Sequence, residues 1–409
     1  MTGSAVAHRG ATGTDEGSAM SISSPTGDDE ERAELRSLVR QIVAGEATDE
    51  RLRTLDEAEQ FDQELYTTLG EAGLIGLEAS ADGKEGADPR SQTVVLEELG
   101  ATATSMAVCL VVQYMGVQLL TSHGSELQRK EILAPLLEGR TMVAFALTEP
   151  DGGTDVARVM RTKADLQDDG SWVLNGTKTW ISGAANAEHA IVVARTAAPE
   201  PSAIDGITMF LVPLSTPGID VRELQTVAIH GLDTCEVNFD DVKIPAGAVL
   251  GEAGRGFRQV LATLNGERLN AAATALGIAR GAHETALAYA KERQAFGRSI
   301  GGFQAPQHRM VDDAVRIEAA RELTRRAASA EAAGERADVL SAMAKLAASE
   351  AATQAADNGM RLMAGAGLSR EYPMQRYFRD ARLYTFAPLT DDMIRNYLGE
   401  RLLGLPRSF

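Results

Sequence analysis

Residues 145–155 read Phe-Ala-Leu-Thr-Glu-Pro-Asp-Gly-Gly-Thr-Asp, and residues 178–183 read Lys-Thr-Trp-Ile-Ser-Gly. The first stretch predicts a strand that ends at Pro150 and opens into a Gly-Gly turn. The second predicts another strand, entered through a tight hairpin turn at Asn175-Gly176. Exposed backbone N–H groups and hydroxyls beside one flat indole suit a planar ring that carries carbonyls and ring nitrogens. Either stretch alone indicates only a β-turn in a globular domain.

Composition narrows the class of protein. With 409 residues, the chain is long enough for two or three packed domains. A hydrophobic content of 44% and a charged content of 24% are ordinary for a soluble globular protein. The net charge of −18, without a run of Lys or Arg, argues against nucleic acid or an anionic membrane as partner. An anionic ligand would need locally placed arginines.

The cysteines and the N-terminal segment bear on the compartment. Cys109 and Cys235 lie far apart, which favours buried free thiols in a reducing compartment, and no zinc-type spacing occurs. Residues 1–27 are rich in Gly, Ser, Thr and Ala without an apolar signal-peptide core, so we expect a disordered tail. The long uncharged stretch 102–121 predicts a buried helix before a membrane span. We expect a cytoplasmic protein without a metal.

Hydrophobic periodicity divides the rest of the chain into three parts. Apolar residues recur at helical spacing over 28–140, so we expect an all-helical N-terminal domain. Over 141–250 the period changes to two and β-branched residues become frequent, which predicts a middle antiparallel β domain. Over 251–409 the helical period returns, and abundant Ala favours a four-helix bundle in an α+β protein. Its helices are expected at 254–294, 304–333, 336–365 and about 372–403.

The two quoted stretches and this order of domains resemble the flavin-binding centre and the fold of the acyl-CoA dehydrogenase family. The resemblance covers nearly everything after residue 28 and implies bound FAD. In the family, an aromatic residue and two hydroxyl residues of the first stretch contact the isoalloxazine, and a Trp and a hydroxyl residue of the second flank the ring near N5. The matching residues here are Phe145, Thr148, Thr154, Trp180 and Ser182.

Further FAD contacts are implied in the C-terminal half. Glu292-Arg293-Gln294-Ala295-Phe296-Gly297, followed by Gln304, matches the family's "ER..FG…Q" segment, which reaches the pyrophosphate and adenylate of a neighbouring subunit's FAD. A guanidinium beside a glycine suits a pyrophosphate, because it makes forked contacts while bare backbone lets the ligand approach. Without the resemblance, Arg293 would be a solvated helix residue.

A third segment departs from the family pattern. Where the family has "Q.FGG.G", this chain keeps Gly365 and Gly367 but has Arg361 in place of Gln. Arg361 either supplements the pyrophosphate contacts or is surface charge. Thr390 and Asp392 complete the cofactor-binding set that the resemblance implies.

The general base is not at the family's usual position. Most members carry it in a "YEGT" segment, and matching Thr390 to the Thr of that motif puts Pro388 where the Glu should be. A minority, the isovaleryl- and long-chain-type dehydrogenases, carry their Glu in an "ERL" segment. Here Glu267-Arg268-Leu269 matches that segment, and Arg268 stands 25 residues before Arg293, as in the minority pattern. The resemblance therefore implies Glu267 as base, with Arg268 shaping its surroundings, although Glu-Arg in a helix is by default a solvated face.

Pro388 has a second consequence. In the family, a backbone N–H at this position helps to polarise the thioester oxygen, and proline has no N–H. Loss of one such donor typically costs about 3 kcal/mol of transition-state stabilisation. Either Leu389 or Ala387 donates instead, or the reaction is not ordinary acyl-CoA oxidation. Asp391 and Asp392 offer a substitute carboxylate, but helix-terminus charge explains them better.

The acyl pocket and the activity complete the interpretation. By resemblance, Val108 and Val112 line the acyl pocket, and plain core packing explains them equally well. The leading hypothesis is a homotetrameric or dimeric FAD enzyme that oxidises an acyl-CoA thioester to its 2,3-enoyl form and passes electrons to an electron-transfer flavoprotein or similar acceptor. One alternative, favoured by Pro388, is an acyl-carrier-protein thioester as substrate, or a flavin oxidase or oxygenase. The other is a flavin-binding partner protein that has lost catalysis.

Overall fold

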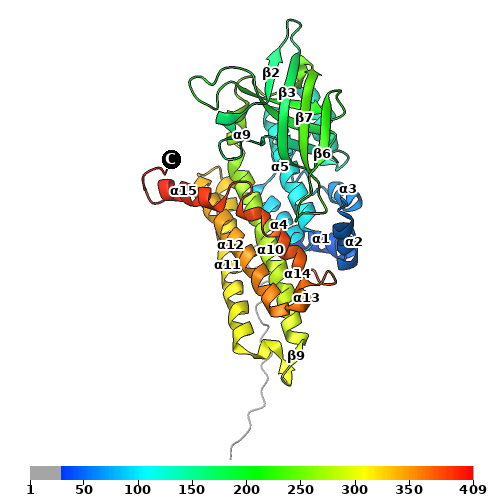
Figure 1. Ribbon diagram of the computed structural model, residues 1–409, viewed down its shortest axis with the longest axis vertical. Helices are drawn as coiled ribbons and strands as arrows, with labels where there is room; N and C mark the ends of the chain where they lie inside the picture. The colour runs from blue at the N-terminus through cyan, green and yellow to red at the C-terminus, as the bar shows by residue number, and fades with distance from the viewer. Residues whose placement is uncertain (1–28, 409) are drawn as a thin grey trace, which may run out of the picture.

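The computed structural model describes residues 29–408, so the predicted tail at 1–27 lies outside the described residues. Within this range the chain runs from helices into a β-sheet and back into long helices, as the periodicity predicts (Figure 1). The sheet forms one end of an elongated molecule, and the long C-terminal helices extend away from it (Figure 1).

The N-terminal part consists of helices, several of which begin at a residue whose side chain caps the helix. The side chains of Asp29, Thr48, Asp62 and Asp88 each accept a hydrogen bond from a backbone N–H of the turn that follows. The elements are α1 (Glu30–Glu46), α2 (Asp49–Ala58), α3 (Gln63–Glu71), α4 (Pro89–Gly100), α5 (Thr104–His123), α6 (Glu126–Gln128), a π-helical turn (Arg129–Leu133) and α7 (Ala134–Leu137). Helix α5 is long and apolar enough to cross a membrane, yet 72% of its most apolar window is buried inside the protein, as expected for a core helix.

The middle part is a twisted sheet in the order β6-β7-β3-β2-β4-β5-β8. Its strands are β1 (Val143–Ala146), β2 (Lys163–Leu166), β3 (Trp172–Ser182), β4 (His189–Arg195), β5 (Ile207–Pro213), β6 (Ile219–Glu223), β7 (Thr234–Ile244) and β8 (Val249–Leu250). The long neighbours pair antiparallel, whereas β1 runs parallel to β4 and β2 meets β4 in parallel at one residue pair. A short helix, α8 (Val156–Val159), follows the Gly-Gly turn.

The predicted hairpin turn at Asn175-Gly176 is wrong. Both residues lie inside β3, where the pairing with β7 is irregular between Leu174 and Gly176. Gly176 has φ +144°, and a Cβ there would lie 2.5 Å from the Thr162 hydroxyl. The Asn175 side chain is tied to Asp241 on β7 by two hydrogen bonds of 3.1 and 2.9 Å. Gly176 is therefore needed because the strand pairing is irregular here and Thr162 lies close by. The chain does not reverse at this point.

The C-terminal part is a bundle with one error in its predicted helices. The elements are α9 (Gly256–Leu261), α10 (Leu264–Glu292), β9 (Gln294–Ala295), β10 (Arg298–Ser299), α11 (Gln304–Ala332), α12 (Asp338–Met363), α13 (Gly365–Leu368), α14 (Met374–Asp380) and α15 (Asp391–Arg401). The last predicted helix, 372–403, is in fact α14 and α15 with a loop between them that contains Pro388. Proline lacks the N–H that a helix interior needs, and Thr390 then caps the new helix.

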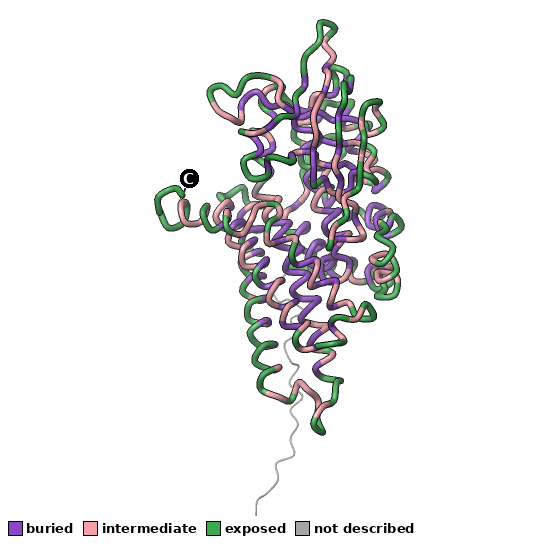
Figure 2. Tube along the Cα trace, viewed as in Figure 1, coloured by how far each residue is buried: buried purple, intermediate pink, exposed green. Residues whose placement is uncertain are grey.

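Helix α10 is the centre of the molecule. Its residues 269–283 are buried without interruption, and Figure 2 shows buried chain along the middle of the bundle and exposed chain on its outer faces. Glycines let α4 approach closely, since a Cβ at Gly277 would lie 2.4 Å from the Glu97 carbonyl oxygen. The position of any residue along α10 therefore fixes its place relative to the other helices.

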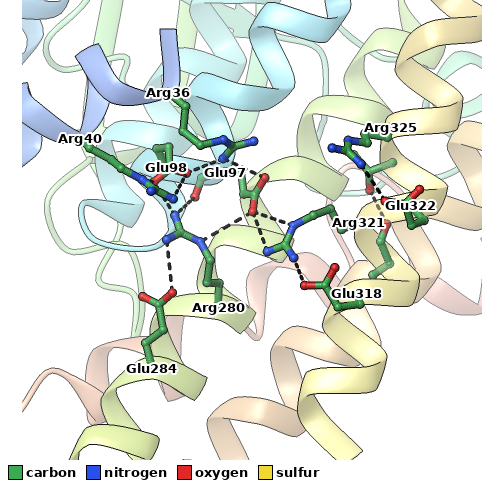
Figure 3. A network of polar contacts seen from close by, with 12 residues as sticks. Arg36, Arg40, Glu97, Glu98, Arg280, Glu284, Glu318, Arg321, Glu322 and Arg325 are labelled. Atoms are coloured by element: carbon green, nitrogen blue, oxygen red, sulfur yellow. Dashed lines mark hydrogen bonds and ion pairs between the residues drawn. The ribbon is translucent and has the colours of Figure 1, made fainter. Parts of the chain in front are cut away.

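A buried ionic network joins α1, α4, α10 and α11 around Glu97 and Glu98 (Figure 3). The Glu97 carboxylate accepts from Arg321 at 3.0 Å and from Arg36 at 3.3 Å, and Arg280 lies 3.7 Å away. Burial alone would raise the pKa of Glu97, but Arg321, Arg36 and Arg280 together lower it to about 2. The carboxylate thus stays charged inside the protein because three guanidinium groups surround it.

Replacing Glu97 with glutamine is expected to lower the free energy of unfolding by about 3–5 kcal/mol, because buried guanidinium charge loses its counter-ion. The measurement is the midpoint of urea unfolding. Glu318→Gln is the matched control, since this glutamate also pairs with Arg321 but its side chain is 41% exposed. We expect that control to change the unfolding free energy by less than about 1 kcal/mol. Equal effects of the two substitutions would contradict a structural role for the buried network.

Candidate active site

The two stretches that attract attention in the sequence lie side by side in the structure. The Thr179 N–H donates to the Thr148 carbonyl at 2.9 Å. The Lys178 Nζ donates to the Leu147 carbonyl at 2.9 Å and to Glu149 Oε1 at 2.8 Å. The end of β1, the Gly-Gly turn and the last residues of β3 therefore form one rigid unit.

Glu149 and Lys178 hold this unit together. Lys178 is completely buried, and Glu149 also accepts from the backbone N–H groups of Arg161 at 2.6 Å and Thr162 at 2.9 Å. Burial lowers the pKa of Lys178 to about 8, and the carboxylate of Glu149 opposes that shift. Neither residue was predicted to be functional, although each belongs to a quoted stretch. A lysine inside a strand, with a glutamate in the neighbouring stretch, is the signal that points to such a pair.

Trp180 is presented to solvent in a strained conformation. Its φ is +60°, in the left-handed region that bulky residues avoid, and its residue surface is 62% exposed. It stands where the pairing of β3 with β7 shifts, between Lys178 and Ile181. Strain of this kind persists where the surrounding structure holds it and collects at functional sites. An exposed indole fixed in this way is a platform for a planar ligand.

The turn beside Trp180 offers unpaired donors. The backbone N–H groups of Gly153, Thr154 and Asp155 have no acceptor among residues 29–408. Thr154 is exposed, and Thr148 and Ser182 are half-buried. Consecutive free N–H groups, hydroxyls and an aromatic face match the carbonyls, ring nitrogens and flat surface of an isoalloxazine. Within the predicted set, Phe145 is half-buried at the end of β1. These residues fit FAD.

Helix α5 connects this seat to the first turn of α10. The Gln113 side chain on α5 donates to the Val143 carbonyl at 3.2 Å and accepts from the Val143 N–H at 3.0 Å, which joins α5 to β1. On the other side, a Cβ at Gly266 would lie 3.6 Å from Gln118 Oε1 of α5. Of the predicted pocket residues on α5, Val108 is 7% exposed and Val112 is half-buried. Val112 is therefore the better placed of the two to meet a ligand.

Glu267 lies in the first turn of α10, next to Gly266. The residue is half-buried, and burial raises the pKa of its carboxyl to about 7, against the opposing charge of Arg268. The Arg268 guanidinium lies 5.0 Å from the centre of the Tyr397 ring on α15. It thus packs across the helix pair, and Glu267 has no ion-pair partner among the described residues. A carboxyl of this pKa suits proton transfer near neutral pH.

The loop between α14 and α15 contains Pro388, the residue that lacks a backbone N–H. The Ala387 N–H already donates to the Leu383 carbonyl at 2.9 Å, whereas the Leu389 N–H has no acceptor within the described part of the chain. Of the two substitute donors considered from the sequence, Leu389 is therefore the one that remains available. The Thr390 hydroxyl is engaged as the cap of α15, accepting from the Met393 N–H at 3.2 Å. The Asp392 side chain is 93% exposed and lies 3.5 Å from Arg395, as a helix-terminus charge would.

The remaining predicted FAD residues lie at the opposite end of the bundle. Arg293 ends α10, and Phe296 is 96% exposed in the short hairpin that follows (Figure 1). Exposed Gln304 begins α11. The 29 residues of α10 span about 43 Å, far more than separates the ring of one FAD from its pyrophosphate. One chain therefore does not bring these residues to its own Trp180.

Arg361 and Gly365 share that far end. The Arg361 guanidinium pairs with Asp357 at 2.7 Å, and Gly365 is exposed just after α12. A Cβ at Gly359, two residues before Arg361, would lie 3.6 Å from Ala286 Cβ near the end of α10. The predicted site residues thus form two groups, one around Trp180 and Glu267 and the other around Arg293. Among residues 29–408, no group of His, Cys, Asp and Glu side chains is arranged to hold a metal ion, and both cysteines are buried free thiols.

Comparison with known proteins follows the same three parts. Residues 29–140 match the acyl-CoA dehydrogenase N-terminal domain, residues 144–242 the middle domain and residues 254–403 the C-terminal domain. The probable acyl-CoA dehydrogenase YngJ of Bacillus subtilis is 34% identical over 378 residues, which cover 90% of this chain and 98% of that protein. A glutaryl-CoA dehydrogenase of Desulfococcus multivorans is 37% identical over 352 residues, covering 85% of this chain and 90% of that one.

Solved structures agree with the fold. Butyryl-CoA dehydrogenase from Megasphaera elsdenii superposes with a TM-score of 0.87 at 32% identity, covering 93% of this chain and all of that one. A glutaryl-CoA dehydrogenase from Mycobacterium smegmatis, in complex with FADH2, superposes with a TM-score of 0.86 at 28% identity, covering 93% and 96% of the two chains. With all three domains matched in order, this chain belongs to the acyl-CoA dehydrogenase family.

Proposed function

We propose that this protein is an FAD-dependent acyl-CoA dehydrogenase that introduces a 2,3-double bond into an acyl thioester, with Glu267 as the base. The observation that carries the proposal is a half-buried carboxyl with a pKa raised to about 7 in the first turn of α10. It is joined through α5 to a strained, exposed Trp180 with free donors beside it. Loss of the usual base at Pro388 is thereby offset within the same chain.

The residues divide the work as follows. Trp180 would support one face of the flavin, and the free N–H groups of 153–155 and the hydroxyls of Thr148 and Ser182 would hydrogen-bond its polar edge. When bound, FAD supplies the acceptor for the hydride that leaves the β carbon of the substrate. Glu267 removes the proton from the α carbon, and its burial keeps the carboxylate basic enough to do so near neutral pH. The free Leu389 N–H is available to the thioester oxygen.

The test is an anaerobic titration of the FAD-loaded protein with acyl-CoA thioesters of short, branched, long and dicarboxylic type. We expect one class to bleach the visible absorbance of the flavin and to yield its 2,3-enoyl thioester. That outcome names the substrate class in the same experiment. Absence of bleaching with every thioester, despite bound FAD, would contradict the proposal.

We further propose that two copies of the chain build each FAD site, in a dimer or a dimer of dimers. Arg293, Phe296, Gln304, Arg361 and Gly365 would reach the pyrophosphate and adenylate of the partner's FAD, because they lie too far from Trp180 of their own chain. Closed homo-oligomers with two-fold symmetry are the commonest way to bring such remote surfaces together.

Complementation tests this two-copy site. Chains with Glu267→Gln and chains with Arg293→Ala are each expected to give little turnover alone. Co-expressed at equal levels, they should regain about a quarter of the wild-type sites, because each mixed dimer holds one site with both residues intact. Turnover that never exceeds the sum of the two separate variants would show that each site is built from one chain.

Pro388 keeps a second candidate function in view. The same fold and flavin would serve an acyl group on a carrier protein, or a flavin oxidase or oxygenase, and bleaching by a carrier-bound thioester alone would select the first of these. A catalytically silent flavin-binding partner is less well supported, because such a protein has no need of a base at Glu267. We propose an electron-transfer flavoprotein or similar protein as the electron acceptor and a cytoplasmic location, which buried free thiols favour.

A further inference from the structure

Lys345 on α12 is a buried lysine whose ammonium group has three hydrogen-bond partners. Its side chain is 1% exposed, and its buried neighbours along α12 include the small residues Ala342, Ala344 and Ala348. Its ammonium group donates to the Tyr384 carbonyl at 2.7 Å and to the Leu389 carbonyl at 2.8 Å. A third hydrogen bond, of 2.7 Å, runs to Asp391 Oδ1. All three donors of the ammonium are thus used, and all three acceptors belong to segment 384–391.

Ser349, one turn later on α12, supports the same segment. Its hydroxyl lies 2.9 Å from the Tyr384 carbonyl oxygen and 2.9 Å from Asp391 Oδ2. The hydroxyl has one proton and donates to one of these two acceptors at a time, so α12 reaches Asp391 Oδ1 through Lys345 and Oδ2 through Ser349. We call Lys345, Ser349 and Asp391 the loop clamp. It holds both ends of the loop that contains Pro388.

The clamped segment lies along the face of α10 that carries Glu267. The Tyr384 hydroxyl lies near Thr274, which stands seven residues, or two turns, after Glu267 and so on the same face of α10. After this segment, in α15, the Tyr397 ring packs against Arg268, whose guanidinium lies 5.0 Å from the ring centre. The chain between Tyr384 and Tyr397 is thereby fixed along the surroundings of Glu267 at two points.

We propose that Lys345, with Ser349 and Asp391, is a positioning residue that holds the Pro388–Leu389 loop at the substrate thioester, opposite Glu267. The inference rests on the proposed acyl-thioester oxidation. A buried ammonium is unfavourable unless each of its donors is paired. Here all three hydrogen bonds go to segment 384–391. The loop has lost the N–H of residue 388 and keeps the free N–H of Leu389, so its placement decides how the thioester carbonyl is held.

Rapid-mixing measurements of flavin bleaching test the clamp with the thioester that the wild-type protein oxidises. Lys345→Met is expected to lower the bleaching rate at saturating substrate about 100-fold, the loss that a displacement of about 1 Å in a catalytic group brings. The apparent Kd of the thioester and the amount of bound FAD should change little, because the clamp touches neither. Ser349→Ala should lower the rate less, and Ser349→Thr, which keeps a hydroxyl, should restore most of it.

Asn358→Ala is the matched control. Asn358 is also buried on α12 and bonded to a carboxylate, Asp313, at 2.8 Å, but it does not contact the loop. We expect this control to bleach at the wild-type rate even if its yield of folded protein falls. A purely structural role of Lys345 would likewise reduce the folded fraction and leave the rate of the folded molecules unchanged, and that result would overturn the inference.

The two proposals fail in different ways. If the wild-type protein bleaches with a thioester and Lys345→Met bleaches at the same rate, the positioning role is wrong and the oxidation stands. If the wild-type protein bleaches with no thioester, the oxidation itself is wrong. A carbonyl-labelled enoyl thioester bound to each variant adds a second readout. We expect the carbonyl stretching frequency to shift towards that of the free ligand in Lys345→Met and to stay at the wild-type value in Asn358→Ala.

Discussion

Replacing Glu267 with glutamine is expected to slow flavin bleaching by the substrate about 1,000-fold, in the middle of the range for loss of a general base. Glutamine has almost the same shape but cannot accept the α proton. FAD should remain bound, because the flavin seat around Trp180 lies on the sheet and not on α10. The measurement is the bleaching rate at saturating thioester, with flavin content determined for each preparation.

Stability supplies an independent check on the same residue. The folded protein raises the pKa of Glu267 from 4.5 to about 7 by burial. The carboxyl therefore favours the fold below about pH 4.5 and loses that contribution as the pH rises through 7. At pH 8, Glu267→Gln should unfold at a higher temperature than the wild type while being far less active. Such a trade of stability for activity marks a functional group.

Glu284→Gln is the matched control for Glu267. It changes a half-buried glutamate of the same helix, which pairs with Arg280 at 3.5 Å. We expect the control to bleach within about twofold of the wild type, since surface-type ion pairs contribute little. Wild-type rates in Glu267→Gln would show that the base lies elsewhere.

Replacing Lys178 with methionine is expected to lower the free energy of unfolding by about 3–5 kcal/mol, because Glu149 is left as an unpaired buried carboxylate. The protein that still folds should bind FAD weakly, since the same bonds hold the Gly-Gly turn against Trp180. Unfolding in urea and fluorimetric titration with FAD measure the two effects. The pair is thus expected to connect the fold to the cofactor site.

A double variant separates the charge from the geometry. Glu149→Gln combined with Lys178→Met removes both charges, and the amide oxygen keeps an acceptor for one of the two N–H groups, that of Arg161 or that of Thr162. We expect this variant to regain part of the stability but not the FAD affinity, because the bond to the Leu147 carbonyl stays lost. Full recovery of both, or no loss in Lys178→Met, would contradict the proposed role of the pair.

The sequence predicted the order of the domains, because hydrophobic period is a local property that survives folding. It also predicted that the second quoted stretch is a strand, and that stretch forms the end of β3. It failed at Asn175-Gly176. This turn-like dipeptide lies inside β3, where the glycine allows a close contact with Thr162, the residue just before β2. It failed again at 372–403, where the apolar period continues through a loop that Pro388 and the cap at Thr390 interrupt.

The residues that hold the site were less visible than the residues that form it. Lys178 and Lys345 look like ordinary charges in a strand and a helix, and only the fold shows that each is buried with its partner about 30 or more residues away. The separation of Arg293 from Trp180 depends on the uninterrupted length of α10, which no local motif records. The pairing of distant segments and the position of the far end of α10 could therefore be learned only from the structure.

The pH dependence of flavin bleaching tests the role of Glu267 most directly. The quantity is the bleaching rate divided by the apparent Kd of the thioester, which reports ionisations of the free enzyme. Burial raises the pKa of Glu267 to about 7, so this quantity should be constant at alkaline pH and fall about tenfold per pH unit below 7, as the carboxylate is protonated. A profile that stays flat through pH 7, or the same fall in Glu267→Gln, would show that another group removes the proton.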